Sequence, residues 1–348
     1  MNNRILPLAL AAFLVVVARA GSAAAQPPTE QDGIKLKATL VSVPVIVSDR
    51  NGRYLSGLRA EDFTLYSDHV KQPIAVFEAT EEPLNVALLL DTSLSTRDVL
   101  GDIKDAALSF IKRLRPQDRA VIVSFDYDVH LLSPLTADRR ALEQAVKRAE
   151  IGAYAGTVLR DAVIKAANDS LRHVEGRKAI VLLTDGKDHG SAVSEVESLE
   201  AAQESGAMIY TIFYRTGFAP RFDNRRGGFG RGGFGRRGGI FGDSLPRRGP
   251  NNERRERRRE RAERNNEQAA DYLGQLADAS AGRFYSGEVT DLKKTFDLIA
   301  DELRHQYRLG FYPSGEPAGA AVHRLTVQVA HPDAVVRARR TYHATPSQ

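Results

Sequence analysis

Three short stretches of the chain carry side-chain oxygens of the kind that bind a hard divalent cation. The stretches are DTSLS (91–95), AGT (155–157) and TDGKD (184–188). Together they supply two carboxylates and three hydroxyls, from Asp91, Ser93, Ser95, Thr157 and Asp185. Mg²⁺ prefers six oxygen ligands in a near-octahedral array and keeps several of its waters. Because two carboxylates balance the charge of a divalent ion, we predict that these five residues form a site for Mg²⁺ or Mn²⁺.

Each stretch taken alone has a simpler interpretation. A segment with Asp and Ser after a strand, such as DTSLS, commonly caps the helix that follows. A segment such as TDG is commonly a turn, and AGT by itself carries almost no information. The ordered combination of all three favours the metal site over these alternatives. Asp188, at the end of the third stretch, is expected to face solvent, with a supporting role at the site as the alternative.

The metal site requires the stretches to meet, and the flanking sequence provides for this. The run LNVALLL (84–90) ends directly at Asp91, and the run KAIVLLT (178–184) ends directly at Asp185. Near-continuous apolar runs are typical of strands that are buried on both faces of a parallel sheet. Open parallel sheets bind ligands at the carboxyl ends of their strands. We therefore expect both carboxylates at one edge of one sheet.

Strands alternate with helices through residues 84–305, which predicts a doubly wound, mostly parallel α/β domain. Helical patterns are expected over 99–114, 139–150, 158–174, 194–205, 266–280 and 291–306. Short β patterns occupy residues 36–80 before this domain and residues 306–345 after it. We expect these outer strands to pair with each other, so that the α/β domain is inserted into a small β-sandwich.

The pattern DxSxS…T…D resembles the metal-ion-dependent adhesion site of the von Willebrand factor A (VWFA) domain family, and the resemblance covers about residues 84–305. It implies that the Ser93, Ser95 and Thr157 hydroxyls bind the metal directly, whereas the two Asp residues act mainly through water. The threonine loop often reads GGT in relatives and reads AGT here. The flanking segments, VPVIVSDRNG…GLRAEDF and QYRLGFYP…RARRTY, resemble exported VWFA-related proteins of Acidobacteria.

The first residues predict export. Arg4, an apolar run at 5–17 and the small residues AAA at 23–25 have the layout of a secretory signal peptide over residues 1–25. The run is too short to span a bilayer comfortably as a helix, and we expect no membrane span elsewhere. With no Cys in the chain, a lipoprotein anchor is excluded. We expect a periplasmic or extracellular protein that lacks disulfides.

The basic character of the chain is concentrated in one segment. Residues 215–264 contain 16 Arg and six acidic residues, although the whole chain has a formal net charge of +5. Its glycines and low apolar content predict a disordered insertion over 216–265, although ERRERRRERAER (253–264) has charges at the spacing of a solvated helix. The segment is either a tolerated loop expansion or a collector of acidic polymers. An intracellular RNA role conflicts with the predicted export.

These features favour a metal-dependent binding or adhesion module over an enzyme. The bound ion is expected to accept an Asp or Glu from an unidentified partner protein, which requires no reaction. The main alternative is the binding of a polyanion, an acidic glycan or nucleic acid, through the Arg/Gly-rich insertion. Hydrolysis is a weaker alternative, because the sequence offers a metal site but no convincing nucleophile or general base.

Overall fold

The computed structural model describes residues 40–214, 250–313 and 322–343. The predicted signal peptide and the Arg/Gly-rich stretch 215–249 lie outside these ranges and stay predictions. Within the described ranges, no helix is long and apolar enough to cross a membrane.

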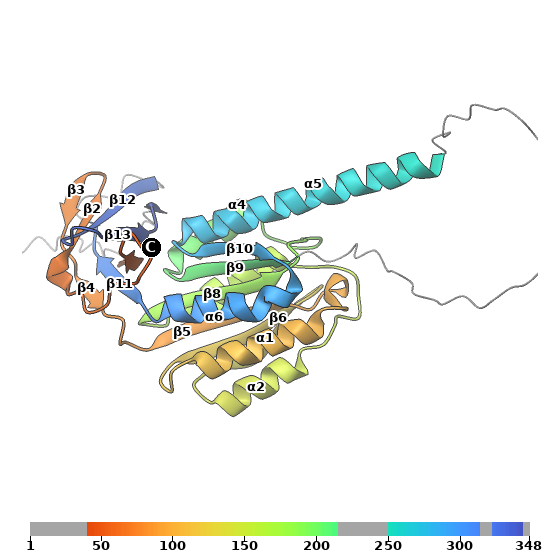
Figure 1. Cartoon of the computed structure of the whole chain (residues 1–348), viewed down its shortest axis with the longest axis horizontal. Helices are drawn as coiled ribbons and strands as arrows, with labels where there is room; N and C mark the ends of the chain where they lie inside the picture. Colours follow the sequence, from red (N-terminus) through yellow and green to blue (C-terminus); the bar gives the residue numbers. More distant parts are fainter. Residues whose placement is uncertain (1–39, 215–249, 314–321, 344–348) are drawn as a thin grey trace, which may run out of the picture. The chain divides into compact units, whose positions relative to one another are not determined.

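A six-stranded sheet forms the centre of the α/β domain (Figure 1). Its spatial order is β10-β9-β8-β5-β6-β7, and every neighbouring pair is parallel except β6 and β7. The strands are β5 (Leu84–Asp91), β6 (Arg119–Phe125), β7 (Val129–Thr136), β8 (Arg177–Thr184), β9 (Met208–Tyr214) and β10 (Arg283–Gly287). Because β8 lies beside β5 although β6 and β7 intervene in the chain, the strand order reverses between β5 and β8. Open α/β sheets bind ligands at such a reversal.

Helices cover both faces of this sheet because alternate residues of its strands point to opposite sides. Val86, Leu88 and Leu90 of β5 share one core with three helices: α1 (Leu100–Arg113), α2 (Arg139–Arg148) and α6 (Leu292–Leu303). Ala87 and Leu89 belong to a second core, on the other face. The helical elements in that core are α3 (Leu159–Ile164), its wider π-helical continuation η3 (Lys165–Leu171), α4 (Glu195–Glu204) and α5 (Pro250–Ala279).

The outer strands form two antiparallel sheets, in the orders β13-β1-β11-β4 and β14-β12-β2-β3. The early strands are β1 (Val41–Ser48), β2 (Phe63–Ser67), β3 (Val70–Gln72) and β4 (Val76–Glu78). The late strands are β11 (Gln306–Phe311), β12 (Val322–Val329), β13 (Val335–Ala338) and β14 (Thr341–His343). As expected, strands from before and after the α/β domain pair with each other, β1 with β11 and β2 with β12. Side chains from both sheets share one apolar core.

Arg177, at the start of β8, connects the α/β domain to the antiparallel sheets. Its buried guanidinium donates hydrogen bonds to the carbonyl oxygens of Glu82, Leu303 and Gln306. Glu82 lies just before β5, and the other two residues end α6 and begin β11. One side chain thus binds both chain segments that enter and leave the α/β domain.

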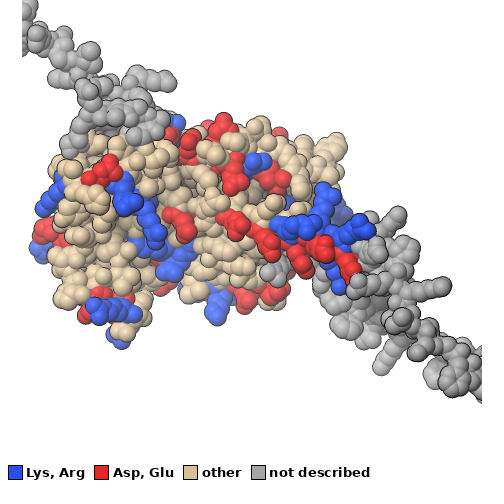
Figure 2. Space-filling model, turned by 90° about the horizontal axis from the view of Figure 1, so that it is seen from above, with Lys and Arg blue, Asp and Glu red and all other residues tan. Residues whose placement is uncertain are grey.

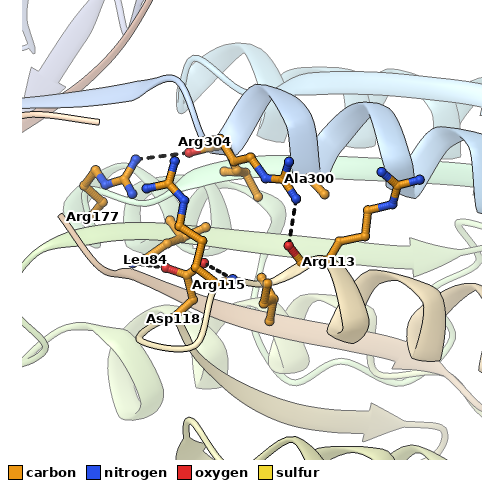
Figure 3. Close-up of a pocket in the computed structure, with 9 residues that line it drawn as sticks. Leu84, Arg113, Arg115, Asp118, Arg177, Ala300 and Arg304 are labelled. Atoms are coloured by element: carbon orange, nitrogen blue, oxygen red, sulfur yellow. Dashed lines mark hydrogen bonds between the residues drawn. The ribbon is translucent and has the colours of Figure 1, made fainter. Parts of the chain in front are cut away.

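Three further arginines lie near the same pocket as Arg177 at this edge of the sheet, opposite the ends of β5 and β8 (Figure 3). They are Arg113, Arg115 and Arg304, and they line a small pocket with Asp118 and apolar side chains. The space that a water-sized sphere can enter there is about 10 Å³, which holds about one water molecule. The pocket is too small for an organic ligand, so the arginines belong to the junction of the two parts of the fold.

Residues 250–265 of the expected disordered insertion are helical, because α5 begins at Pro250 and continues unbroken to Ala279; this agrees with the alternative of a helix that the charge spacing of 253–264 indicated. Figure 1 shows its first half extending beyond the sheet that its second half covers. Buried Leu273 and Leu276 anchor the helix on the second core. The Arg and Glu residues that precede the anchored half have high helix propensity, so the helix continues into sequence that has no core to pack against.

Candidate metal centre

The carboxylate of Asp91 is held at the boundary between β5 and β8. Asp91 is the last residue of β5 and is fully buried. Its Oδ1 accepts hydrogen bonds from the Ser93 hydroxyl, at 2.6 Å, and from the Ser93 backbone N–H, at 3.0 Å. Its Oδ2 accepts one from the Thr184 hydroxyl, at 2.7 Å. Since Thr184 ends β8, this last bond joins the carboxyl ends of the two strands between which the strand order reverses.

The two serines of DTSLS continue this group of oxygens toward solvent. The Ser93 and Ser95 hydroxyl oxygens lie 3.1 Å apart, and Ser95 is exposed whereas Ser93 is buried. Neither of the two helical elements that follow, η2 (Leu94–Thr96) and α1, has a hydrogen bond from a capping side chain at its N-terminus. The helix-cap interpretation of DTSLS is therefore wrong, and the serine hydroxyls point to another role.

The loop that carries Thr157 is fixed by backbone hydrogen bonds from both sides. The N–H of Val158 donates to the carbonyl of Asp126, at 2.8 Å, and the N–H of His189 donates to the carbonyl of Thr157, at 2.9 Å. Gly156 has φ +151° and lies against the Tyr127 side chain, where a Cβ would have little room. The loop after β8, which follows Asp185, therefore lies directly against Thr157.

Asp185 follows β8 and is almost completely buried. The Lys187 ammonium forms an ion pair with its carboxylate. The prediction that Asp188 faces solvent is wrong. Its carboxylate binds the backbone N–H and the side chain of Arg160, at 3.0 Å each, and the Ser191 hydroxyl, at 2.7 Å. Because Arg160 lies in the first turn of α3, directly after the Thr157 loop, Asp188 ties the two loops together.

The electrostatics of this edge favour a positive ion. Burial and the charge of Asp185 raise the pKa of the Asp91 carboxyl to about 6. Burial, followed by the charges of Asp91 and Asp185, also raises the pKa of the Tyr214 hydroxyl. That hydroxyl is buried at the end of β9 and has no hydrogen-bond partner in the described part of the chain. A cation with its waters would compensate the two carboxylates and give the hydroxyl a partner, so these residues fit a metal ion.

The chemistry of the donor groups limits which ion could bind at this edge. The described residues contain no group of three or more His, Cys, Asp and Glu side chains arranged to hold a metal. A cation at this edge would depend on hydroxyl oxygens and water in addition to two carboxylates. Oxygen ligands of this kind suit hard ions such as Mg²⁺ and Mn²⁺.

Three residues of this edge were not among the predicted site residues: Thr184, Lys187 and Tyr214. Thr184 and Tyr214 end apolar strands at the same edge as Asp91, so the argument from strand ends could have found both. Nothing in the sequence indicates that Lys187 contacts Asp185, because that contact depends on the path of the loop.

Part of the chain matches a known domain family. Residues 86–187 match the von Willebrand factor type A domain. The match begins in β5 and ends just beyond Asp185, and it therefore spans all five predicted ligand residues. The central sheet with helices on both faces, accompanied by antiparallel sheets, is a VWFA-like α/β fold.

One curated relative and several solved structures are similar to parts of the chain. Uncharacterized protein sll0103 of Synechocystis sp. is 32% identical over 113 residues, which make up 31% of this chain and 26% of that protein. A von Willebrand factor type A structure from Catenulispora acidiphila is 15% identical, with a TM-score of 0.43 and coverage of 89% of this chain and 64% of that one. Mussel byssus proximal thread matrix protein 1 was solved with a zinc-occupied MIDAS (metal-ion-dependent adhesion site) motif. It is 15% identical, with a TM-score of 0.46 and coverage of 67% of this chain and 48% of that one.

Proposed function

We propose that the VWFA-like domain binds Mg²⁺ or Mn²⁺ and, through that ion, an Asp or Glu side chain of a partner protein. Ser93, Ser95 and Thr157 would supply neutral ligands, and Asp91 and Asp185 would supply the compensating charge. The observation that supports this most is the meeting of the Asp91, Ser93 and Ser95 oxygens at the end of β5, beside Thr184 at the end of β8. Neutral ligands leave much of the ion's charge available to an incoming carboxylate.

The surroundings of the site support binding from solution. Ser95 is exposed while Asp91, Ser93, Thr157 and Asp185 are buried. A partner would therefore approach the proposed site from the side of Ser95. The bound ion would supply a Lewis-acidic position for the partner's carboxylate. The function requires no covalent step, and we propose a non-enzymatic module. The signal-peptide pattern of residues 1–25 supports a location outside the cytoplasm.

Water-proton relaxation with Mn²⁺ tests this proposal without a known partner. Protein-bound Mn²⁺ that keeps exchangeable waters enhances the relaxation of bulk water. We expect N-acetyl-aspartate methylamide, at millimolar concentration, to displace such a water and lower the enhancement, whereas the asparagine analogue has no effect. Asp185→Asn should lose the enhancement, and Asp98→Asn, at an exposed acid in the loop between β5 and α1, should keep it. Equal effects of the two analogues would refute carboxylate binding.

The exposed half of α5 supports a second function, the binding of acidic polymers. Described Arg side chains there are exposed and have no core to pack against; they are Arg257, Arg259, Arg261 and Arg264. Figure 2 shows basic and acidic side chains interspersed on the part of the described surface at the right of the view. Arginine suits carboxylate and phosphate groups because its planar fork binds them in pairs.

Retention on heparin tests this second function. Exchanging these four arginines for Gln should lower the salt concentration at which the protein elutes and flatten its salt dependence, since contacts with anionic groups release counterions. A control variant carries the same exchange at four exposed arginines elsewhere, Arg97, Arg140, Arg148 and Arg172. Equal losses in the two variants would show that α5 has no special role.

A further inference from the structure

The Lys187 ammonium forms an ion pair with the Asp185 carboxylate, and it thereby offsets a negative charge that the proposed metal ion needs. The Asp185 side chain is only 1% exposed, whereas the Lys187 side chain is 31% exposed. Lys187 is therefore the part of this pair that can leave without breaking the core. A Lys ammonium is a single charge on a flexible four-carbon stem, so it can move aside while the backbone of the loop stays in place.

The turn at Gly186, between the two residues, brings Lys187 back toward Asp185. Gly186 has φ +75°, a conformation that other residues rarely adopt. A Cβ at Gly186 would lie 2.6 Å from the Cβ of Ala269 in α5 and 3.1 Å from the Phe213 ring in β9. The N–H of Gly186 also donates to the Thr184 hydroxyl, at 2.9 Å. Ala269, Phe213 and Thr184 thus hold the turn in place, and the turn keeps Lys187 close to Asp185.

The buried carboxylates need such a charge. A buried anion without a partner is costly, and Asp91 and Asp185 are both buried at the ends of the neighbouring strands β5 and β8. In the absence of a divalent ion, the Lys187 ammonium offsets part of this negative charge.

We propose that Lys187 is a tethered counter-ion that occupies Asp185 when the metal is absent and is displaced when a divalent cation binds. This inference rests on the proposed metal site. Because each binding event must break the ion pair, Lys187 lowers the affinity of the site for metal and stabilises the metal-free protein. It also favours divalent over monovalent ions, since a monovalent ion brings no more charge than the ammonium that it replaces.

Titration calorimetry with Mn²⁺ alone tests the inference on the full chain. We expect Lys187→Met, which keeps the length of the side chain and removes its charge, to bind Mn²⁺ about tenfold more tightly than the wild type, the factor that corresponds to about 1.4 kcal/mol. Lys112→Met is the matched control. Lys112 is an exposed lysine near the end of α1, and α1 leads away from the metal edge toward the Arg113 pocket. This control should leave the affinity unchanged.

Thermal unfolding provides a second readout that does not depend on the heat of binding. In EDTA, Lys187→Met should melt several degrees below the wild type because Asp185 loses its counter-ion, and saturating Mn²⁺ should remove this difference. Equal or weaker Mn²⁺ binding by Lys187→Met would overturn the inference while leaving the proposed function in place. Mn²⁺ binding by the variant alone would support it, and binding by neither protein would overturn both proposals.

Discussion

The Thr184 hydroxyl donates a hydrogen bond to the Asp91 carboxylate, at 2.7 Å, and both residues are fully buried. One strand of the sheet thus orients the carboxylate at the end of its neighbour. This contact fixes Asp91 before any ligand is bound, and it lies on the side of the carboxylate opposite the Ser93 hydroxyl contact.

Replacing Thr184 by Val should weaken Mn²⁺ binding about 10- to 100-fold, the range typical of lost hydrogen bonds that orient a metal ligand. The shape of the side chain is kept, so the sheet should remain intact by circular dichroism. Competition against a fluorescent Mn²⁺ indicator measures the change. Thr136→Val, at the far end of β7, serves as the control. A loss of less than threefold at Thr184 would show that the contact does not orient Asp91.

Arg177 should matter for stability and not for metal binding, because it lies at the opposite edge of the sheet. Arg177→Met removes the guanidinium that donates to the carbonyl groups of Glu82, Leu303 and Gln306. We expect the free energy of unfolding in urea to fall by about 2–4 kcal/mol. Arg172→Met, at a nearby exposed arginine, should change it little. A stable Arg177→Met protein, or one with altered Mn²⁺ affinity, would contradict this account of the junction.

Lys178 should give the protein an alkaline rise in stability. Its ammonium is buried and donates to the Leu171 carbonyl, and burial, with the nearby charge of Arg308, lowers its pKa from 10.5 to about 8. Between these values the unfolded chain binds a proton that the folded protein lacks, so the free energy of unfolding rises with pH through this window. Below pH 8, the cost of the buried charge is fully present.

Lys178→Met removes this dependence. At pH 7, in EDTA, the variant should be more stable than the wild type by about 1–3 kcal/mol, the upper limit following from the size of the pKa shift. The difference should shrink as the pH rises from 8 to 10. Urea unfolding at pH 7, 8, 9 and 10 measures it. A difference that stays constant across this range would mean that Lys178 is not the titrating group.

The central sheet and the positions of Asp91 and Asp185 could be predicted because their signals are local. Near-continuous apolar runs such as LNVALLL are typical of a strand that is buried on both faces, and the polar residue that follows each run marks the edge of the sheet. The pairing of the outer strands followed from their short β patterns at both ends of the chain. The structure agrees with both predictions.

The remaining features depend on contacts between distant parts of the sequence. Asp188 was expected to face solvent, but its partner Arg160 lies 28 residues away on α3. The contact of Lys187 with Asp185 depends on how Gly186 packs against Ala269 of α5. The length of α5 depends on the packing of its second half against the core. Composition alone does not show that the helix extends from this packed half back through its charged first half.

A calorimetric titration of Mg²⁺ and Mn²⁺ into the wild type, Asp185→Asn and Asp98→Asn tests directly whether the VWFA-like domain binds a divalent ion at this site. We expect saturable binding of one ion per chain by the wild type and by Asp98→Asn, and none by Asp185→Asn. Absence of binding to the wild type, or equal binding by Asp185→Asn, would show that the proposed metal site is wrong.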